Sequence, residues 1–479
     1  MSASFSPTLH DVSPEVALAV VAEHQGPVLV DLDETLYLSN STEDFIDSVA
    51  PRLPALLLLR LLELIRPWRW TGGEATRDIW RVRLICLLFP WTMQRWKVRV
   101  ADLAARYRNT RLIDVLSASS ARPVVATIGF VPIVTPLVAA LGLPLAPIVA
   151  ARLHTLADRR GGKLELTCTA LGDGFVGESL VLTDSAQDLP LLEACALPLR
   201  VIWPLAQYRP ALADVYLPGL YLTRVKRPGE RYITRAIVQE DFALWVLASI
   251  GLATQPFSHI LGLALLLLSF WTIYEVGYVD NDLIASRFEA DPKLGAAFAS
   301  APVATPPWQP WIWAFATGAA GVLVLRWQTR VAPVDLLAWA GVLLATHGWF
   351  TLYNRFDKGT RVWLFAGLQF ARSAAFVALV PISPIGAAAL GAHVLAKWVP
   401  YYVYRLVGKA WPEAPFHLTR LLFFAVLAAL LAFTSGVLSI LTGSAAALLV
   451  WNLYRARQEL ATACAAARRL DHVVTEPQP

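Results

Sequence analysis

The chain changes character near residue 225, and this change constrains its fold more than any other feature. Beyond it, apolar runs recur near 237–254, 257–279, 308–326, 334–353, 361–381, 385–404, 418–434 and 437–454. Overall, 56% of the residues are hydrophobic and 16% are charged, against about 45–50% and about 25% in soluble domains. Because about 20 apolar residues cross a bilayer, the pattern predicts an all-α, polytopic membrane bundle of about eight to nine spans over residues 226–460. A cytosolic tail would follow over residues 461–479.

Basic residues flank these apolar runs. Arg224, Lys226 and Arg227 precede the first run, and Arg455 and Arg457 follow the last. Loops rich in Lys and Arg stay in the cytoplasm, so we expect both termini and the N-terminal domain to be cytoplasmic. The N-terminal stretch also lacks the basic start and apolar core of a secretory signal. We expect an integral protein of a bacterial-type inner membrane, with the membrane and no nucleic acid as partner, since the basic residues form no long cluster.

Residues 1–225 instead alternate short β-rich runs with helical patterns. The runs lie near 27–32, 123–127, 145–151, 178–183 and 199–203. Such alternation predicts an α/β domain with a parallel sheet covered on both faces. A helical insertion over about 40–115 separates the first two runs, and its apolar stretches carry internal charges and are shorter than a span. We interpret it as a cap with its own small core; a sharper interpretation adds an apolar face that rests on the membrane surface.

Two carboxylates follow the first predicted strand. Asp31 and Asp33 stand one residue apart, directly after the apolar run 27–30, and alternate residues of a strand face the same way. Ligands of open α/β sheets bind at the carboxyl ends of the strands. A carboxylate pair there can hold Mg²⁺, attack a phosphorus atom or transfer a proton. The alternative is a turn in which the aspartates bond the backbone.

Further polar residues follow later elements of the same domain. Thr127 ends the second predicted strand, with Gly129 opening the next helix, and a hydroxyl there suits a phosphate oxygen. Lys163 can neutralise charge on a transferred group. Asp184 ends another predicted strand, with Asp188 a helical turn later, and Asp184 can complete an Mg²⁺ site with the earlier carboxylates.

In order, these motifs resemble those of the haloacid dehalogenase (HAD) phosphohydrolase superfamily over about residues 25–205. The sequence DLDET at 31–35 matches the first motif, Thr127 the second, Lys163 the third, and TDSAQD at 183–188 the fourth. The insertion resembles the helical cap of that family. The resemblance implies a Rossmann-like phosphohydrolase domain over residues 1–225.

The resemblance also implies a role for each matched residue. Asp31 would be the nucleophile that forms an aspartyl-phosphate, and Asp33 would protonate the leaving group and then activate water. Thr127 and Lys163 would hold the phosphoryl oxygens. The implied ligands of an Mg²⁺ cofactor are Asp31, Asp33, Asp184 and Asp188, the last holding either the metal or Lys163. A degenerate domain kept as a scaffold is the alternative.

A second acidic cluster lies where the second apolar run ends. Its polar members are Glu275, Asp280, Asn281, Asp282 and Glu289. Acidic residues at a helix end that faces a bundle interior can bind Mg²⁺–diphosphate, whereas a solvated loop is the alternative. The cluster resembles the first aspartate-rich motif of the UbiA-like intramembrane prenyltransferases, with Ala285 in place of the middle aspartate. That resemblance implies a bundle of about nine spans that acts on a polyprenyl substrate.

Several polar residues fall inside the apolar runs: His347, Gln369, Arg372, His393 and Lys397. Charges inside a membrane are costly, so we expect Arg372 and Lys397 to face an interior cavity or to reach an interface. Together, the patterns and the two resemblances imply a two-part membrane enzyme that removes a phosphate and handles a lipid or polyprenyl phosphate, through prenyl or phosphoribosyl-type transfer. The alternatives are an active phosphatase anchored by an inert bundle, and a lipid-binding or transport bundle regulated by the soluble domain.

Overall fold

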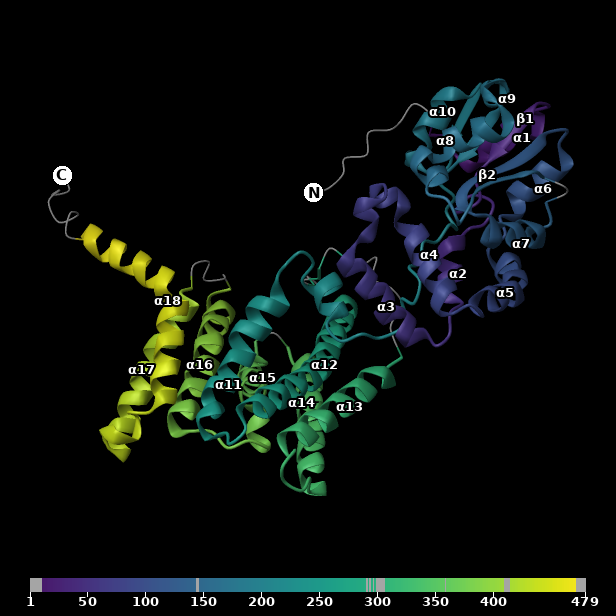
Figure 1. Ribbon diagram of the computed structural model, residues 1–479. Helices are drawn as coiled ribbons and strands as arrows, with labels where there is room; N and C mark the ends of the chain where they lie inside the picture. The colour runs from purple at the N-terminus through teal and green to yellow at the C-terminus, as the bar shows by residue number, and fades with distance from the viewer. Residues whose placement is uncertain are drawn as a thin grey trace, which may run out of the picture. The chain divides into compact units, whose positions relative to one another are not determined.

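The computed structural model describes residues 11–143, 146–289, 292, 294–295, 297–298, 306–357, 359–408 and 414–470. The chain divides into two compact units, and the boundary along the chain lies between Val215 and Tyr216. We call the N-terminal part unit 1 and the C-terminal part unit 2 (Figure 1). Leu145, where the third strand was predicted to begin, and residues 471–479 of the predicted tail lie outside the described residues.

Unit 1 contains the predicted parallel sheet. Its five strands are β1 (Pro27–Val30), β2 (Arg122–Phe130), β3 (Ile148–Ala151), β4 (Leu180–Thr183) and β5 (Leu197–Arg200). They are ordered β3-β2-β1-β4-β5, and every neighbouring pair is parallel. All residues of β1 and β4 are buried, and alternate residues point to opposite faces, so both faces of the sheet centre are covered.

Helices cover the sheet of unit 1: α1 (Pro14–Glu23), α7 (Val131–Leu141), α8 (Ala157–Leu171), α9 (Asp173–Glu178) and α10 (Leu189–Ala194). One core joins Leu29 and Val181 of the sheet to Val176 of α9 and Leu191 of α10. Strand bounds differ slightly from prediction: β2 runs on to Phe130, so Gly129 lies inside the strand and α7 begins two residues later.

The insertion between β1 and β2 is helical, as predicted. It comprises α2 (Ser41–Asp47), α3 (Arg52–Ile65), α4 (Arg77–Leu88), α5 (Thr92–Tyr107) and α6 (Thr110–Ala118), with the short 3₁₀ turns η1 (Pro67–Trp70) and η2 (Gly73–Thr76). The fully buried Trp96 of α5 donates its indole N–H to the Ile133 carbonyl at 3.1 Å, which fastens α5 to α7. Leu61, Leu64 and Ile65 of α3 are exposed.

Unit 2 is built from helices. They are η4 (Leu222–Lys226), η5 (Ile233–Phe242), α11 (Ala243–Ser249), α12 (Pro256–Phe288), α13 (Trp308–Leu325), α14 (Pro333–Arg355), α15 (Val362–Ala374), α16 (Pro384–Val407), α17 (Phe416–Ser435) and α18 (Gly443–Leu470), with short 3₁₀ turns between some of them. Each predicted apolar run therefore coincides with helical structure. Of the described helices, α12, α14 and α17 are long and apolar enough to cross a membrane. The all-α bundle is confirmed, while the count of eight to nine spans stays a prediction.

Two other helices of unit 2, α15 and α16, are either too short or too polar to meet this criterion of length and apolar character. Helix α15 has 13 residues, too few to cross about 30 Å of hydrocarbon. Helix α16 contains Pro400 and the charged Lys397 and Arg405.

Helices α12 and α13 pack closely because glycines of the two helices face each other. A Cβ on Gly262 would lie 3.1 Å from the Gly321 carbonyl oxygen. Small residues permit such close approach in membrane bundles.

Candidate functional site

The carboxyl end of β1 carries the two predicted aspartates. The Asp31 N–H donates to the Leu182 carbonyl at 2.9 Å, which continues the pairing of β1 with β4 by one residue. The chain then turns sharply, because Glu34 has a left-handed φ of 57° and the Tyr37 N–H donates to the Leu32 carbonyl at 2.9 Å. Asp31 is consequently buried and fixed by the sheet, while Asp33 lies on the turn.

Lys163 joins Asp31 to Asp188. Its Nζ lies 2.8 Å from Asp31 Oδ2 and 2.5 Å from Asp188 Oδ2, and all three side chains are buried. Burial would lower the pKa of Lys163, but the charges of the two carboxylates raise it above its ordinary value. Lys163 therefore stays charged at neutral pH. The structure thus brings together residues of the first, third and fourth predicted motifs.

Thr183 is a member of this site that the sequence interpretation missed. Its Oγ1 lies 3.0 Å from Asp31 Oδ2 and 2.6 Å from Asp188 Oδ2, within hydrogen-bond distance of both. A hydroxyl has one proton, so it donates to one carboxylate at a time. The sequence feature that could have pointed to Thr183 is its position as the last residue of β4, directly before Asp184. Thr183 and Lys163 together hold Asp31 and Asp188 side by side.

Asp33 is held by the first residue of α2. The Ser41 N–H donates to Asp33 Oδ1 at 2.7 Å and the Ser41 hydroxyl donates to Oδ2 at 3.1 Å. Burial raises the pKa of Asp33 to about 7, against the lowering effect of these two hydrogen bonds. A carboxyl group with a pKa near neutrality can both give and take a proton at pH 7.

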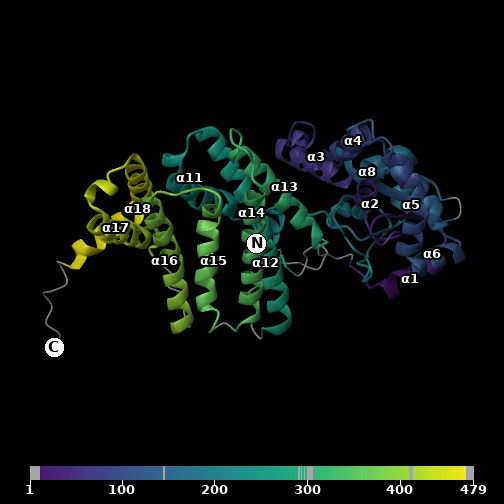
Figure 2. The ribbon, with the colours of Figure 1, turned by 90° about the horizontal axis from the view of Figure 1, so that it is seen from below.

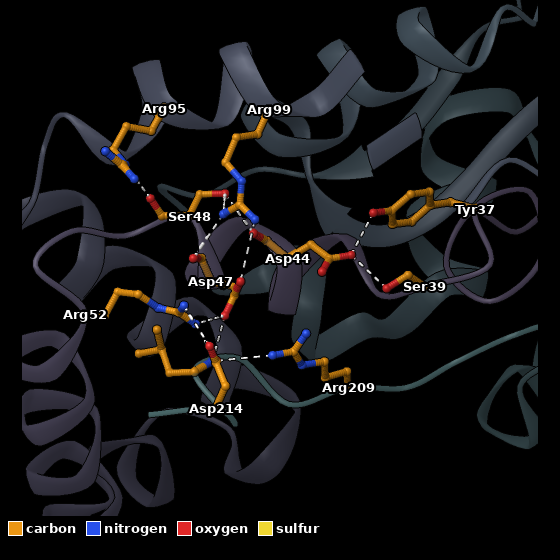
Figure 3. Close-up of polar contacts among 11 residues, drawn as sticks. Tyr37, Ser39, Asp44, Asp47, Ser48, Arg52, Arg95, Arg99, Arg209 and Asp214 are labelled. Atoms are coloured by element: carbon orange, nitrogen blue, oxygen red, sulfur yellow. Dashed lines mark hydrogen bonds and ion pairs between the residues drawn. The ribbon is translucent and has the colours of Figure 1, made fainter. Parts of the chain in front are cut away.

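Polar contacts fix α2, and hence Ser41, in place (Figure 3). Asp44 accepts hydrogen bonds from Tyr37 and Ser39, both at 2.7 Å, so α2 is tied to the loop after β1. At the other end of α2, Asp47 pairs with Arg52 at 2.7 Å, and Arg99 of α5 donates to the Ser48 hydroxyl at 3.1 Å. The helix that positions Asp33 is thereby attached to the insertion.

Asp184 lies at the neighbouring strand end. Its Oδ1 accepts the Thr35 hydroxyl at 3.2 Å, and its backbone carbonyl accepts Arg200 Nε at 3.1 Å. Burial, followed by the negative charges of Asp31 and Glu34, raises the pKa of Asp184 to about 7. Ser185 next to it caps a short 3₁₀ turn by accepting the Gln187 N–H at 3.2 Å.

Thr127 comes close to the residues that hold Asp33. Its hydroxyl oxygen accepts the Gly129 N–H at 3.0 Å. A Cβ on Gly129 would lie 3.3 Å from Thr127 Oγ1 and 3.5 Å from Ser41 Oγ, so these three residues share one small space. Within the described part of the chain, no hydrogen bond joins the Thr127 side chain to the carboxylates of the site.

The donor set at this edge suits Mg²⁺ in chemistry. Asp31, Asp184 and the carbonyl of Asp33 are hard oxygen donors of the kind that Mg²⁺ takes, usually with several waters. Burial is the largest cause of the raised pKa of Asp184, followed by the negative charges of Asp31 and Glu34; a cation would relieve this repulsion between carboxylates. Among the described residues, no group of three or more His, Cys, Asp or Glu side chains is placed to hold a metal ion. Asp188 is occupied by Lys163, which favours its positioning role over ligation.

The acidic cluster on α12 is arranged differently, because most of its members have partners within unit 2. Glu275 accepts the N–H groups of Gly219 and Leu222, at 2.9 and 2.7 Å, and the Tyr216 hydroxyl at 2.6 Å. It therefore fastens the start of η4 to α12. Asp282 pairs with Lys226 of η4 at 2.5 Å and accepts the hydroxyl of Tyr221, the residue directly before η4, at 2.8 Å.

The remaining members of the α12 cluster follow the same pattern, with one exception. Asn281 donates to Asn354 Oδ1 at 2.8 Å, and Glu289 pairs with Arg361 at 3.4 Å. Asp280 is half-buried and makes no hydrogen bond or ion pair within the described part of the chain. The five residues lie on or directly after one helix end, but they do not converge on a common point.

The sequence interpretation also missed two buried acidic residues in unit 2. Glu240 and Asp241 of η5 are 4% and 1% exposed and pair with basic residues of α15, α17 and α18. The signal was weak, because both stand inside an otherwise apolar run.

No protein-family model, curated protein or solved structure matches the chain.

Proposed function

We propose that unit 1 hydrolyses a phosphate monoester through Asp31 and that unit 2 lies in a membrane and handles a lipid phosphate. The observation that carries the first part is the shared contact of Lys163 with Asp31 and Asp188 at the carboxyl end of β1. A buried cation beside a carboxylate at a strand end suits an incoming phosphate group. The apolar helices α12, α14 and α17 support the second part.

The chemistry would proceed in two steps on Asp31. Its carboxylate oxygen attacks the phosphorus atom, the bond to the ester oxygen breaks, and Asp33 gives that oxygen its proton. Water then attacks the phosphorus of the aspartyl-phosphate, with Asp33 taking a proton from the water, and phosphate leaves. Asp33 suits both roles because its pKa lies near 7.

The neighbouring groups would hold the phosphoryl oxygens. Lys163 neutralises negative charge, and Thr127 offers a hydroxyl near the Asp33 turn. Mg²⁺ held by Asp31, Asp184 and the carbonyl of Asp33 would supply further charge neutralisation. Thr183 and Asp188 keep Lys163 and Asp31 in register.

The test is phosphate release by the purified full chain from a panel of phosphate monoesters, with and without Mg²⁺. We expect Asp31→Asn to lower the rate at least about 1,000-fold, because the nucleophile is lost. Asp102→Asn, at an exposed position on α5, is the matched control and should keep the wild-type rate. Equal rates for the wild type and Asp31→Asn would refute the proposal.

A second candidate for unit 2 is prenyl or phosphoribosyl-type transfer to or from a polyprenyl phosphate at the end of α12. The observation in its favour is that Asp282 and Lys226 stand side by side, offering both a metal ligand and a phosphate-binding cation. Asp282→Ala should then abolish transfer in membranes supplied with a prenyl diphosphate or an activated sugar phosphate. Unchanged transfer would exclude this site, and absence of transfer by the wild type would leave an anchored phosphatase.

A further inference from the structure

Six basic side chains of unit 2, three of them buried and three half-buried, lie on helices other than α12. They are Arg372, His393, Lys397, His417, Arg420 and Arg455, and we call them the buried basic cluster. Its members come from α15, α16, α17 and α18, and two carboxylates of η5 face it. Helix α16 packs against both α15 and α17 and lies between them in Figure 2. Segments far apart in the sequence therefore build one polar interior.

The carboxylates of η5 neutralise only part of this charge. Arg372 Nε donates to Asp241 at 2.6 Å, and both Arg420 and Arg455 contact Glu240. Three arginines thus pair with two buried carboxylates, and Lys397 is a fourth cation that forms no ion pair with either. The negative charge of Glu459 in α18 attracts Arg420. The Glu459 carboxylate also accepts the Leu418 N–H near the start of α17. Even with Glu459 counted, the cations are in excess by one, and excess buried charge is costly without a counter-ion.

Several donors in the cluster have no hydrogen-bond partner among the residues that the structure describes. His393 is 1% exposed, and neither ring nitrogen makes a hydrogen bond; its Nε2 is 3.8 Å from Asp241 Oδ1, too far for a direct one. Nη2 of Arg420, which is also 1% exposed, is unpartnered as well. Lys397 makes no hydrogen bond or ion pair with any residue that the structure describes. Buried donors are normally satisfied, so Lys397 and Nη2 of Arg420 indicate a missing acceptor. His393 instead faces Asp241 Oδ1, a carboxylate oxygen that also has no hydrogen-bond partner among the described residues.

The missing acceptor would lie among these three donors. Both Lys397 and Arg420 act electrostatically on His393, and the Lys397 Nζ lies 5.3 Å from the Phe416 ring centroid. Lys397 is half-buried, whereas His393 and Arg420 are buried. A tetrahedral anion with several acceptor oxygens can meet donors from α16 and α17 at once.

An apolar pocket is lined by the tryptophan that one member of the cluster contacts. The guanidinium of Arg372 sits 4.8 Å from the centroid of the Trp271 ring. Trp271 also lines a pocket of about 290 Å³ together with Ile237, Phe242 and Leu267. Cationic donors next to an apolar pocket fit a ligand that has an anionic head and a hydrocarbon chain.

We propose that the buried basic cluster binds a phosphate group, with His393, Lys397 and Arg420 as its donors and a hydrocarbon chain in the pocket beside Trp271. The inference rests on the proposal that unit 2 handles a lipid phosphate, but it does not depend on hydrolysis by unit 1. It also differs from binding at the end of α12, because it requires no metal. If the network served only to hold helices together, the N–H groups of His393 and Lys397 would have no hydrogen-bond acceptor.

The test is equilibrium binding to the full chain in neutral detergent, with EDTA present so that neither metal-dependent binding nor hydrolysis interferes. The probes are decyl phosphate, decanol and inorganic phosphate. We expect decyl phosphate to bind at least about tenfold more tightly than decanol, because a charged hydrogen bond contributes about 1.5–3 kcal/mol. Binding of decyl phosphate alone supports a lipid head group, and competition by inorganic phosphate supports a free phosphate. Equal affinity for decyl phosphate and decanol would overturn the proposal.

Variants locate the site. Lys397→Gln should weaken decyl phosphate binding at least about tenfold, and Lys397→Arg should retain most of it. Arg457→Gln, at an exposed position on α18, is the matched control and should bind as the wild type does. The thermal unfolding midpoint of each variant shows whether it folds; if Lys397→Gln does not, His393→Leu replaces it.

The outcomes separate this inference from the proposed function. Unchanged binding by a folded Lys397→Gln, together with Asp31-dependent phosphate release, would overturn the cluster site and leave the phosphatase standing. Binding that depends on Lys397 without any phosphate release would support the cluster site while refuting the phosphatase.

Discussion

The acidic residues at the end of β1 and those at the end of α12 resemble one another in sequence but differ in their surroundings. At β1, one lysine and one threonine are shared between Asp31 and Asp188. No ion pair joins Asp33 or Asp184 to a cation within the part of the chain that the structure describes. At α12, Asp282 has its own lysine and Glu275 is used up by backbone N–H groups. The difference indicates that an acidic motif can form a reactive or ligand-binding site only where its carboxylates are not already neutralised by their own partners.

The two lysines test this difference most directly. Lys163→Met should lower phosphate release about 100- to 1,000-fold, because charge stabilisation at the phosphoryl group is lost. Lys226→Met, which removes the corresponding partner of Asp282, should stay within about twofold of the wild type. Initial rates from one phosphate monoester measure both. A similar loss in the two variants would mean that the regions are not distinct in function.

The two hydroxyl donors should differ in the same direction, with a smaller effect. Thr183→Val removes the hydroxyl shared by Asp31 and Asp188 at nearly constant volume, and we expect a rate about tenfold lower. Tyr221→Phe removes the hydroxyl that Asp282 accepts and should leave phosphate release unchanged. Circular dichroism should show that both variants fold. Wild-type rates for Thr183→Val would contradict the positioning role of this residue.

The pH dependence of stability should distinguish the sheet edge. The pKa values of Asp33 and Asp184 rise from 3.8 to about 7 on folding, so the folded state binds more protons between these values. Stability therefore falls as the pH rises from about 4 to 7, and stays reduced above pH 7. We expect the metal-free thermal unfolding midpoint of the wild type to drop by a few degrees over this range.

A double substitution and Mg²⁺ provide the control for that measurement. Asp33→Asn combined with Asp184→Asn should flatten the pH dependence, because both titrating groups are gone. Mg²⁺ should raise the midpoint more at pH 8 than at pH 5, since it binds ionised carboxylates. A wild-type midpoint that rises steadily with pH would show that other groups dominate.

The smallest effect on catalysis is expected at Glu275. Glu275→Gln weakens the hydrogen bonds from Gly219, Leu222 and Tyr216, and should cost unit 2 about 1–3 kcal/mol of stability. Phosphate release should stay within about twofold of the wild type, with or without Mg²⁺. Thermal unfolding followed by tryptophan fluorescence reports the first quantity. A large loss of activity in a stable variant would make Glu275 part of the phosphate chemistry.

Local patterns predicted much of the secondary structure. Strands β1 and β4 are runs of apolar residues that end at Asp31 and Asp184, so both the strands and the polar residues at their ends could be read directly. The apolar runs of unit 2 likewise each coincide with helical structure. The helix expected after Thr127 is α7, although it begins at Val131 and not at Gly129. These features depend on residues close together in the chain.

Partners distant in sequence could not be read in the same way. Thr183 meets Asp31 across 152 residues, and Arg420 meets Glu240 across 180. Nothing in the local pattern of Asp282 shows that Lys226 neutralises it. A carboxylate in a salt bridge and a free one have the same sequence signature, because pairing depends on which helices and strands become neighbours.

The sequence by itself determined the division into an α/β half and an apolar helical half, and the position of carboxylates at the strand ends. Composition and periodicity suffice for this, because burial of apolar surface sets which segments become strands or helices. Only the tertiary structure decided which charges are satisfied: Lys163 is shared at the sheet edge, Lys226 neutralises Asp282, and Lys397 has no partner among the described residues. Electrostatic interactions act through space over a few ångströms, so they follow the packing of elements and not their order in the chain.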